Sequence, residues 1–229
     1  MATLVLDRPK MHNAMNRALV AQLSQACAEL DADAGVHVVV ITGAGKSFCS
    51  GMDRAEPPTA DLQQLVIDGF GDREALYRLR KPTIAAVSGA AFGSGFELAL
   101  CADILLADTT ASFALPEITF NGMPGAGGTV RLAARAGLQH AMEICCSGRR
   151  VSSDEALALG IAMQVHEPAR LLPEATALAA RMAAQSLAPL MLIKQGLRSA
   201  QQAALASSLP LQTLASYTCI LGRAVPART

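Results

Sequence analysis

The sequence has little that would favour binding to a polyanion. Its 229 residues include 19 basic and 19 acidic side chains, so the formal net charge is zero. It contains no Trp, two Tyr and six Phe. A protein without net positive charge has no long-range attraction for nucleic acid or anionic lipid, and scarce aromatics weaken any base-stacking surface. We therefore expect no nucleic-acid partner.

The sequence also lacks a metal-binding or redox cysteine motif. None of its six cysteines forms a CxxC pair, and no histidine stands beside them at the spacing of metal ligands. We therefore expect reduced cysteines, no metal and no redox cofactor.

Leader and membrane segments are not expected either. The chain opens on the strand-like ATLVLDRP, without a basic region followed by an apolar run. Residues 84–102 are almost uncharged, but Gly89, Gly93, Gly95 and Glu97 interrupt them. These features predict a cytoplasmic protein without a membrane partner.

The hydrophobic pattern predicts strands that alternate with helices. VHVVVITG is a continuous β-branched run, typical of a strand buried on both faces. Predicted strands cover 3–8, 36–43, 83–89 and 103–108, predicted helices cover 16–33, 61–79 and 94–102, and GAGKSFCSGMD is a predicted turn. Such alternation indicates an α/β fold.

Beyond residue 129 the pattern is mostly helical. One further strand is predicted at 161–167, and the Ala-rich stretch 169–222 predicts two or three helices interrupted at Pro189 and Pro210. The length suits one main domain. We expect an α/β core over residues 1–170 and a C-terminal helical region over 171–229.

Three glycine motifs fail on their spacing. GAGKS has Val40 where a phosphate loop needs its first glycine, and GSG at 93–95 has Leu98 where a dinucleotide fingerprint needs its third. Ser94 is flanked at two positions by Phe92 and Phe96 rather than by the glycines of a nucleophile elbow. Nucleotide binding and serine hydrolysis therefore have no support.

Glu97 has two possible roles. Ser94 and Glu97 have the spacing of a capping box, in which the two side chains satisfy free amides at a helix start. However, a strand leads here into a glycine turn and a helix, whose free N–H groups can receive developing negative charge. VHVVVITG also runs into a glycine turn, FCSGMD, so two turns could donate to one oxygen.

Glu117 is a second carboxylate that could reach the same place. A helix of about eight residues spans roughly 12 Å, and a returning strand covers that distance in about four residues. Glu117 could therefore lie near Glu97, or it could be a solvated residue after Pro116. Spacing alone leaves both possibilities open.

Taken together, these segments resemble the enoyl-CoA hydratase/isomerase superfamily, also called the crotonase family. The resemblance rests on GAAFGSGFELALCADILLAD, SFALPEITFNGMPGAGGTVRLAARAG, GKSFCSGMD and the opening LVLDRPKMHNAMN, and it covers roughly residues 3–195. It implies a spiral of ββα units followed by a C-terminal helical region.

The resemblance also implies a site that stabilises the enolate of an acyl-CoA thioester. The oxyanion donors would be the backbone N–H groups of Met52 and Ser94, although the family commonly has glycine where Ser94 stands. Glu97 would activate water and Glu117 would supply the α proton, as in the hydratase branch. Coenzyme A would be part of the substrate, with no separate cofactor. The same resemblance places Lys10, Met11, Asp53, Arg54 and Pro116 at or near the substrate.

Two other functions remain open at this point. A Δ3,Δ2-enoyl-CoA isomerase would shuttle a proton without adding water, and a catalytically silent member would only bind or assemble. The family's basic, aromatic-containing tail, which helps to cover CoA and to build the trimer, has no counterpart in residues 215–229. The resemblance itself implies a homotrimer or dimer of trimers, and the lack of a matching tail predicts weakened CoA binding.

Overall fold

The computed structural model describes residues 1–56 and 74–222, with some side chains after residue 199 excepted. Most of the predicted helix at 61–79 lies outside the described residues. The part that is described ends in one helical turn, α3 (Ala75–Arg78).

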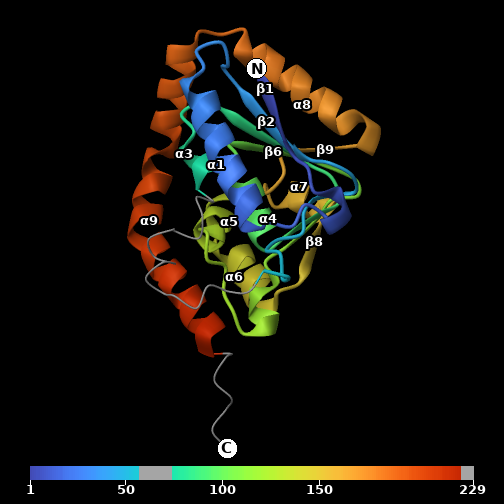
Figure 1. The fold of residues 1–229 in the computed structure, drawn as a ribbon, viewed down its shortest axis with the longest axis vertical. Helices are drawn as coiled ribbons and strands as arrows, with labels where there is room; N and C mark the ends of the chain where they lie inside the picture. The colour runs from blue at the N-terminus through green and yellow to red at the C-terminus, as the bar shows by residue number, and fades with distance from the viewer. Residues whose placement is uncertain (57–73, 223–229) are drawn as a thin grey trace, which may run out of the picture.

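A five-stranded parallel sheet forms one layer of the fold (Figure 1). Its order is β1-β2-β4-β6-β9, and every neighbouring pair is parallel. The strands are β1 (Ala2–Leu6), β2 (Val39–Gly43), β4 (Thr83–Val87), β6 (Ile104–Asp108) and β9 (Gln164–His166). The ends of the predicted strands lie no more than three residues from these bounds.

A second sheet of short strands was missed by the sequence analysis. It has the order β3-β5-β7-β8 and consists of β3 (Ser47–Cys49), β5 (Ala90–Phe92), β7 (Ser112–Ala114) and β8 (Arg150–Ser152). Strands of three residues are too short to show a period of two. The prediction of GAGKSFCSGMD as a turn was therefore wrong at 47–49, where β3 lies.

The two sheets together form repeated ββα units. β2 and β3 precede α3, β4 and β5 precede α4 (Ser94–Cys101), and β6 and β7 precede α5 (Gly128–Ala136) after the 3-10 helix η2 (Pro116–Phe120). Each unit adds one parallel strand to each sheet. The predicted spiral of ββα units is confirmed.

Strand β2 is buried on both faces, as its β-branched run predicts. Val39 and Ile41 belong to the main core, whereas Val40 belongs to a second core beneath α8 (Pro168–Ala183). Figure 1 shows α8 lying across this sheet.

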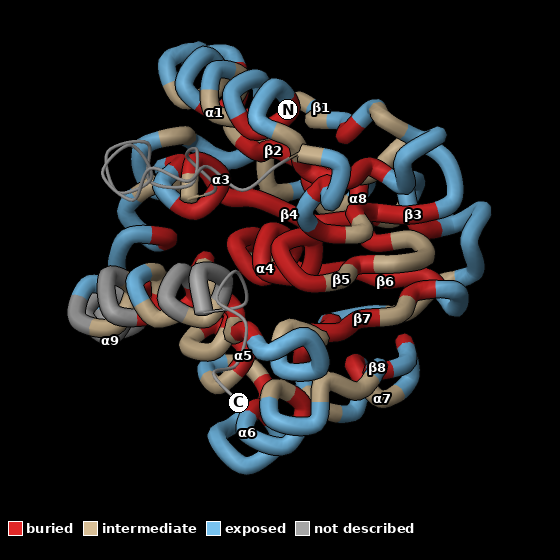
Figure 2. Tube along the Cα trace, turned by 60° about the horizontal axis from the view of Figure 1, so that its bottom comes forward, coloured by how far each residue is buried: buried red, intermediate tan, exposed pale blue. Residues whose placement is uncertain are grey.

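Helix α4 lies at the centre of the molecule, and all eight of its residues are buried. Figure 2 shows it as one continuous buried segment beside the strands. It packs closely on β3, because a Cβ built on Gly95 would lie 2.1 Å from the Cys49 carbonyl oxygen. Glycine at this position sets the distance between helix and strand.

The remaining helices surround this centre. They are α1 (Arg17–Ala32), α6 (Leu138–Ser147), α7 (Ser153–Ala158), the short η1 (Pro9–Met11) and α9 (Leu187–Gly222), which runs along one side of the molecule (Figure 1). Among the described residues, no single helix has both the length and the apolar composition of a membrane span. Helix α8 and residues 187–199 pass that test only jointly, across a bend of 109°.

The predicted breaks at Pro189 and Pro210 were wrong, since α9 is continuous through both. Pro189 occupies the first turn, where its missing N–H would have no intrahelical partner. Tertiary bonds hold the helix on both sides of Pro210. The Lys194 ammonium and the Arg198 guanidinium contact the Asp103 carboxylate at 2.9 and 2.6 Å, and the Ser216 hydroxyl donates to the Met123 carbonyl at 3.1 Å.

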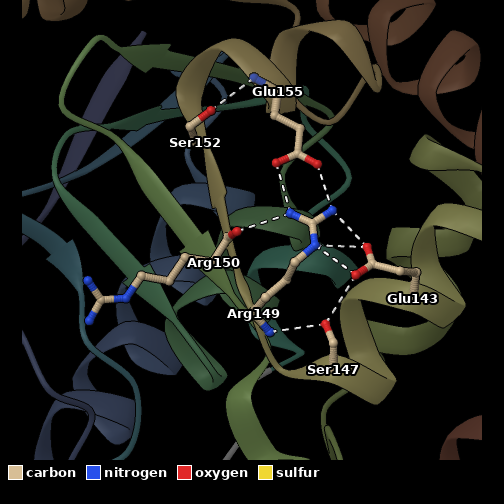
Figure 3. Close-up of polar contacts among 6 residues, drawn as sticks. All are labelled: Glu143, Ser147, Arg149, Arg150, Ser152 and Glu155. Carbon is tan, nitrogen blue, oxygen red and sulfur yellow. Dashed lines mark hydrogen bonds and ion pairs between the residues drawn. The ribbon is translucent and has the colours of Figure 1, made fainter.

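Arg149 joins three elements at the edge of the second sheet. Its guanidinium forms ion pairs with Glu143 of α6 and Glu155 of α7, at 2.7 and 2.6 Å (Figure 3). Ser152 caps α7 by accepting a hydrogen bond from the Glu155 amide. The Glu155 residue thus donates its amide to the cap while its carboxylate binds Arg149.

The close packing of α4 on β3 gives a stability prediction. The methyl group of Gly95→Ala would press on the Cys49 carbonyl group, which belongs to the backbone and cannot move aside cheaply. We expect the variant to lose about 2 kcal/mol or more of unfolding free energy. Gly196→Ala is the matched control, because nothing lies within 4 Å of its added Cβ, and it should gain about 0.5–1 kcal/mol. Denaturant unfolding measures both, and equal effects would contradict the packing argument.

Candidate active site

Two glycine turns meet at the C-terminal ends of β3 and β5. Gly51 has φ +101° and Gly93 has φ +51°, backbone conformations that L side chains rarely adopt. A Cβ built on Gly51 would lie 2.8 Å from the Phe92 carbonyl oxygen and 3.7 Å from the Ser94 nitrogen. The backbone that precedes Met52 and the backbone that enters Ser94 therefore lie in contact.

Ser94 begins α4 without backbone strain. Positive φ falls on Gly93, which is the N-cap, and Ser94 is not among the described non-glycine residues with positive φ. Serine can thus replace the glycine that is common in the family. Since the N-cap is Gly93 and no side chain caps this helix, the capping-box interpretation of Ser94 and Glu97 was wrong.

The carboxylate of Glu97 is held by the loop that precedes α5. Its Oε1 accepts hydrogen bonds from the amides of Ala126, at 2.8 Å, and Gly128, at 2.9 Å. The residue is only 2% exposed. Gly128 is the first residue of α5, so the positive end of a helix dipole faces this oxygen. Both amides and the dipole favour negative charge on Glu97.

The carboxylate of Glu117 reaches the same region from η2. A Cβ built on Gly93 would lie 2.9 Å from Glu117 Oε1, so the acid lies against the turn that begins α4. The Gly93 amide also donates to the Ala114 carbonyl at 2.9 Å, which ties this turn to β7. The interpretation of Glu117 as a solvated surface residue was wrong, because its Oε2 is buried.

Glu117 is poised to hold a proton. Its Oε2 has no hydrogen-bond partner in the described part of the chain. Burial, together with the nearby charge of Glu97, raises the pKa of Glu117 to about 8. The two acids therefore differ at neutral pH. Glu97 is stabilised as an anion by two amides, and Glu117 is mostly a neutral acid.

The loop formed by residues 8–16 supports the Met52 turn. The Met15 amide donates to the Gly51 carbonyl and the Asp53 amide donates to the Met15 carbonyl, at 2.8 and 3.0 Å. The buried Asn13 side chain donates to the carbonyls of Ala44 and Ser47, at 2.9 and 2.7 Å. These bonds show that Asn13 and Met15 fix the backbone that leads into Met52.

The predicted substrate-binding residues border this region in different ways. Lys10 and Met11 are exposed on η1. Asp53 is buried and pairs with Arg8 at 2.9 Å, while the Arg54 guanidinium lies 5.4 Å from the centre of the Phe120 ring. Pro116 begins η2 and so helps to place Glu117.

The Asp53 carboxylate has a structural role. The Ala55 amide and Arg8 both donate to it, and these bonds lower its pKa. A carboxylate occupied in this way has less capacity to bind a ligand group.

Two pockets lie elsewhere on the described part of the molecule. One pocket, with a volume of about 560 Å³, lies between α3 with the residues that follow it and the start of α9. The other, of about 260 Å³, is lined by apolar residues of η2, α5 and α6 and by the loop after η2. Neither is lined by Glu97 or Glu117, so the converging backbone turns and acids identify the site better than cavity size does.

Sequence reasoning did not identify the residues that hold Glu97. Ala126 and Gly128 act through backbone amides, which leave no side-chain signature. PGAGGT was quoted for the resemblance and contains both residues, so the motif was visible although its contact with Glu97 was not. Arg131, which donates to the Ala126 carbonyl, was also missed.

Comparison with known proteins connects this chain to one family. The enoyl-CoA hydratase/isomerase family profile matches residues 1–218. A probable enoyl-CoA hydratase of Rhizobium meliloti is 40% identical over 173 residues, which cover 75% of this chain and 67% of the relative. The mitochondrial enoyl-CoA hydratase of Pongo abelii is 39% identical over 171 residues, which cover 74% of this chain and 59% of that relative.

Solved structures agree with the sequence matches. An enoyl-CoA hydratase subunit from Geobacillus kaustophilus superimposes with a TM-score of 0.83 at 36% identity, covering 96% of this chain and 86% of that one. With ββα units, two converging turns and the glutamates Glu97 and Glu117 beside them, the chain belongs to the enoyl-CoA hydratase/isomerase family.

Proposed function

We propose that this protein is an enoyl-CoA hydratase, a carbon–oxygen lyase that adds water across the 2,3 double bond of a 2-enoyl-CoA thioester. The observation that carries the proposal is the contrast between the two acids. Two amides donate to Glu97 Oε1 and favour its charged form, whereas Glu117 has a raised pKa and an unpaired Oε2. Hydration needs one group that accepts a proton from water and another that donates one.

The thioester carbonyl would bind between the two turns. The backbone amides of Met52 and Ser94 would donate to its oxygen, and each such donor contributes roughly 3 kcal/mol as negative charge develops there. Glu97 would take a proton from water, and the water oxygen would bond to the β carbon. Glu117 would then protonate the α carbon of the enolate. The proton that Glu97 took from water would return to Glu117 directly or through solvent, so that both acids regain their starting states and one water is added in total. This sequence supplies the base, the acid and the anion site that the reaction requires.

The role of Glu117 can be tested by Glu117→Gln. Glutamine keeps the shape of the acid but cannot supply the α proton, so kcat with crotonyl-CoA should fall by about 10²–10⁴-fold. Mass spectrometry of the product should show one added water for the wild type.

The control is Glu174→Gln, which removes a surface carboxylate paired with Arg170 on α8 and should retain full activity. Conversion of a 3-enoyl-CoA to its 2-enoyl isomer without added water would favour an isomerase, and no turnover of either substrate by the wild type would favour a silent binding subunit. Near-normal activity of Glu117→Gln would remove Glu117 from the mechanism.

The raised pKa of Glu117 gives a pH prediction. As an acid that must be protonated, Glu117 should cause kcat/KM to fall as pH rises through about 8.

The same pKa gives a stability prediction. The folded protein binds this proton more tightly than the unfolded chain, so Glu117 lowers the unfolding free energy progressively as pH rises from 4.5, its pKa in the unfolded chain, to about 8. Glu117→Gln should therefore gain stability relative to the wild type as pH rises through that window. Parallel unfolding curves at pH 5 and pH 9, with the same difference at both, would contradict the assignment.

The assembly of the protein is also a proposal. We propose a homotrimer or dimer of trimers in the cytoplasm, with no separate cofactor. Support for assembly comes from exposed apolar side chains around the smaller pocket, where Ile118, Leu138 and Met142 are 48%, 70% and 56% exposed. Light scattering after gel filtration should give three or six times the 23.8 kDa chain mass, and Leu138→Glu should shift that mass toward the monomer. A monomeric wild type would contradict this proposal.

A further inference from the structure

Arg131 is a buried cation that the proposed mechanism does not use. It lies in the first turns of α5 and has 0% exposure. Its Nη1 donates to the Ala126 carbonyl at 2.5 Å, its Nη2 pairs with Glu74, and its guanidinium lies 4.4 Å from the centre of the Tyr77 ring. Burial of a guanidinium is costly unless such partners compensate it.

The position of Arg131 links it to Glu97. Ala126 accepts from Arg131 through its carbonyl and donates to Glu97 Oε1 through its amide. One residue of the loop is therefore fixed at both of its backbone polar groups. Any shift of the Ala126 carbonyl would also turn the amide that holds Glu97.

The loop needs such a restraint because of its composition. Gly125, Gly127 and Gly128 flank Ala126, and glycine has the largest conformational freedom of any residue. From the other side, α9 restrains the earlier part of the loop, where Thr213 donates to the Gly125 carbonyl at 3.2 Å. Arg131 supplies the bond at Ala126 itself.

We propose that Arg131 is a positioning residue of the active site, which holds the Ala126–Gly128 loop so that its amides keep Glu97 oriented. This inference rests on the proposed function for its kinetic consequence, although the loop restraint can be measured separately. Lysine could not replace it. A lysine ammonium keeps the charge, but it lacks the planar fork that reaches Ala126 and Glu74 together.

The kinetic test compares Arg131→Lys with Arg135→Lys. Arg135 lies on the same helix and donates to the carbonyls of Ala102 and Ile161, at 2.5 and 3.2 Å, neither of which is in the loop. Arg131→Lys should lower kcat for crotonyl-CoA by about 10–100-fold with KM within about threefold, because a small misplacement of a catalytic group affects the transition state most. Arg135→Lys should lose thermal stability but keep kcat within about twofold. Equal kcat losses in the two variants would overturn the inference.

Hydrogen exchange tests the restraint without any substrate. Amides in the segment 123–128 should exchange faster in Arg131→Lys than in the wild type, with no such change in Arg135→Lys. Unchanged exchange there would overturn the inference even if kcat falls. If the wild type fails to hydrate crotonyl-CoA, the proposed function fails, and the exchange comparison alone decides whether Arg131 holds the loop.

Discussion

The site depends on one buried interaction, the pair of hydrogen bonds from Ala126 and Gly128 to Glu97. An ionised carboxylate with 2% exposure would be very costly without them. The bonds also favour negative charge on Glu97. With Glu97 satisfied as an anion, the neighbouring Glu117, which has no donor at Oε2, is easier to keep protonated.

The fold makes the rest of the site possible by bringing three distant segments together. The parallel strands β3, β5 and β7 end side by side, and each continues into a segment of the site, the Met52 turn, the Ser94 turn and η2. These strands have only three residues each, and so their register depends on close packing. Gly95 against the Cys49 carbonyl is one of these close contacts. The geometry of the site thus depends on how closely α4 packs on β3.

The long strands and helices and the two acids could be predicted from the sequence. The short strands of the second sheet and the backbone amides that hold Glu97 could not. The strand in VHVVVITG could be predicted because burial on both faces leaves a continuous β-branched run. Glu97 and Glu117 stood out because a carboxylate among apolar residues is costly to bury without a partner or a function. β5 and β7 were missed because three residues show no period. Ala126 was missed because a backbone amide looks the same at every position. Pro210 was misleading because tertiary contacts along α9 outweigh one lost helical hydrogen bond.

The C-terminal helix α9 is tied to the site by charge rather than by apolar packing alone. Asp103 binds both Lys194 and Arg198, and the Arg198 guanidinium lies 4.2 Å from the centre of the Tyr77 ring, which Arg131 also contacts. Buried cations on α9 and α5 therefore share one aromatic ring and are compensated by acids from other elements. Such an arrangement tolerates little displacement, since moving one cation leaves its partner charge buried and unpaired. A helix distant in sequence from the glutamates thus contributes to the rigidity that their hydrogen bonds require.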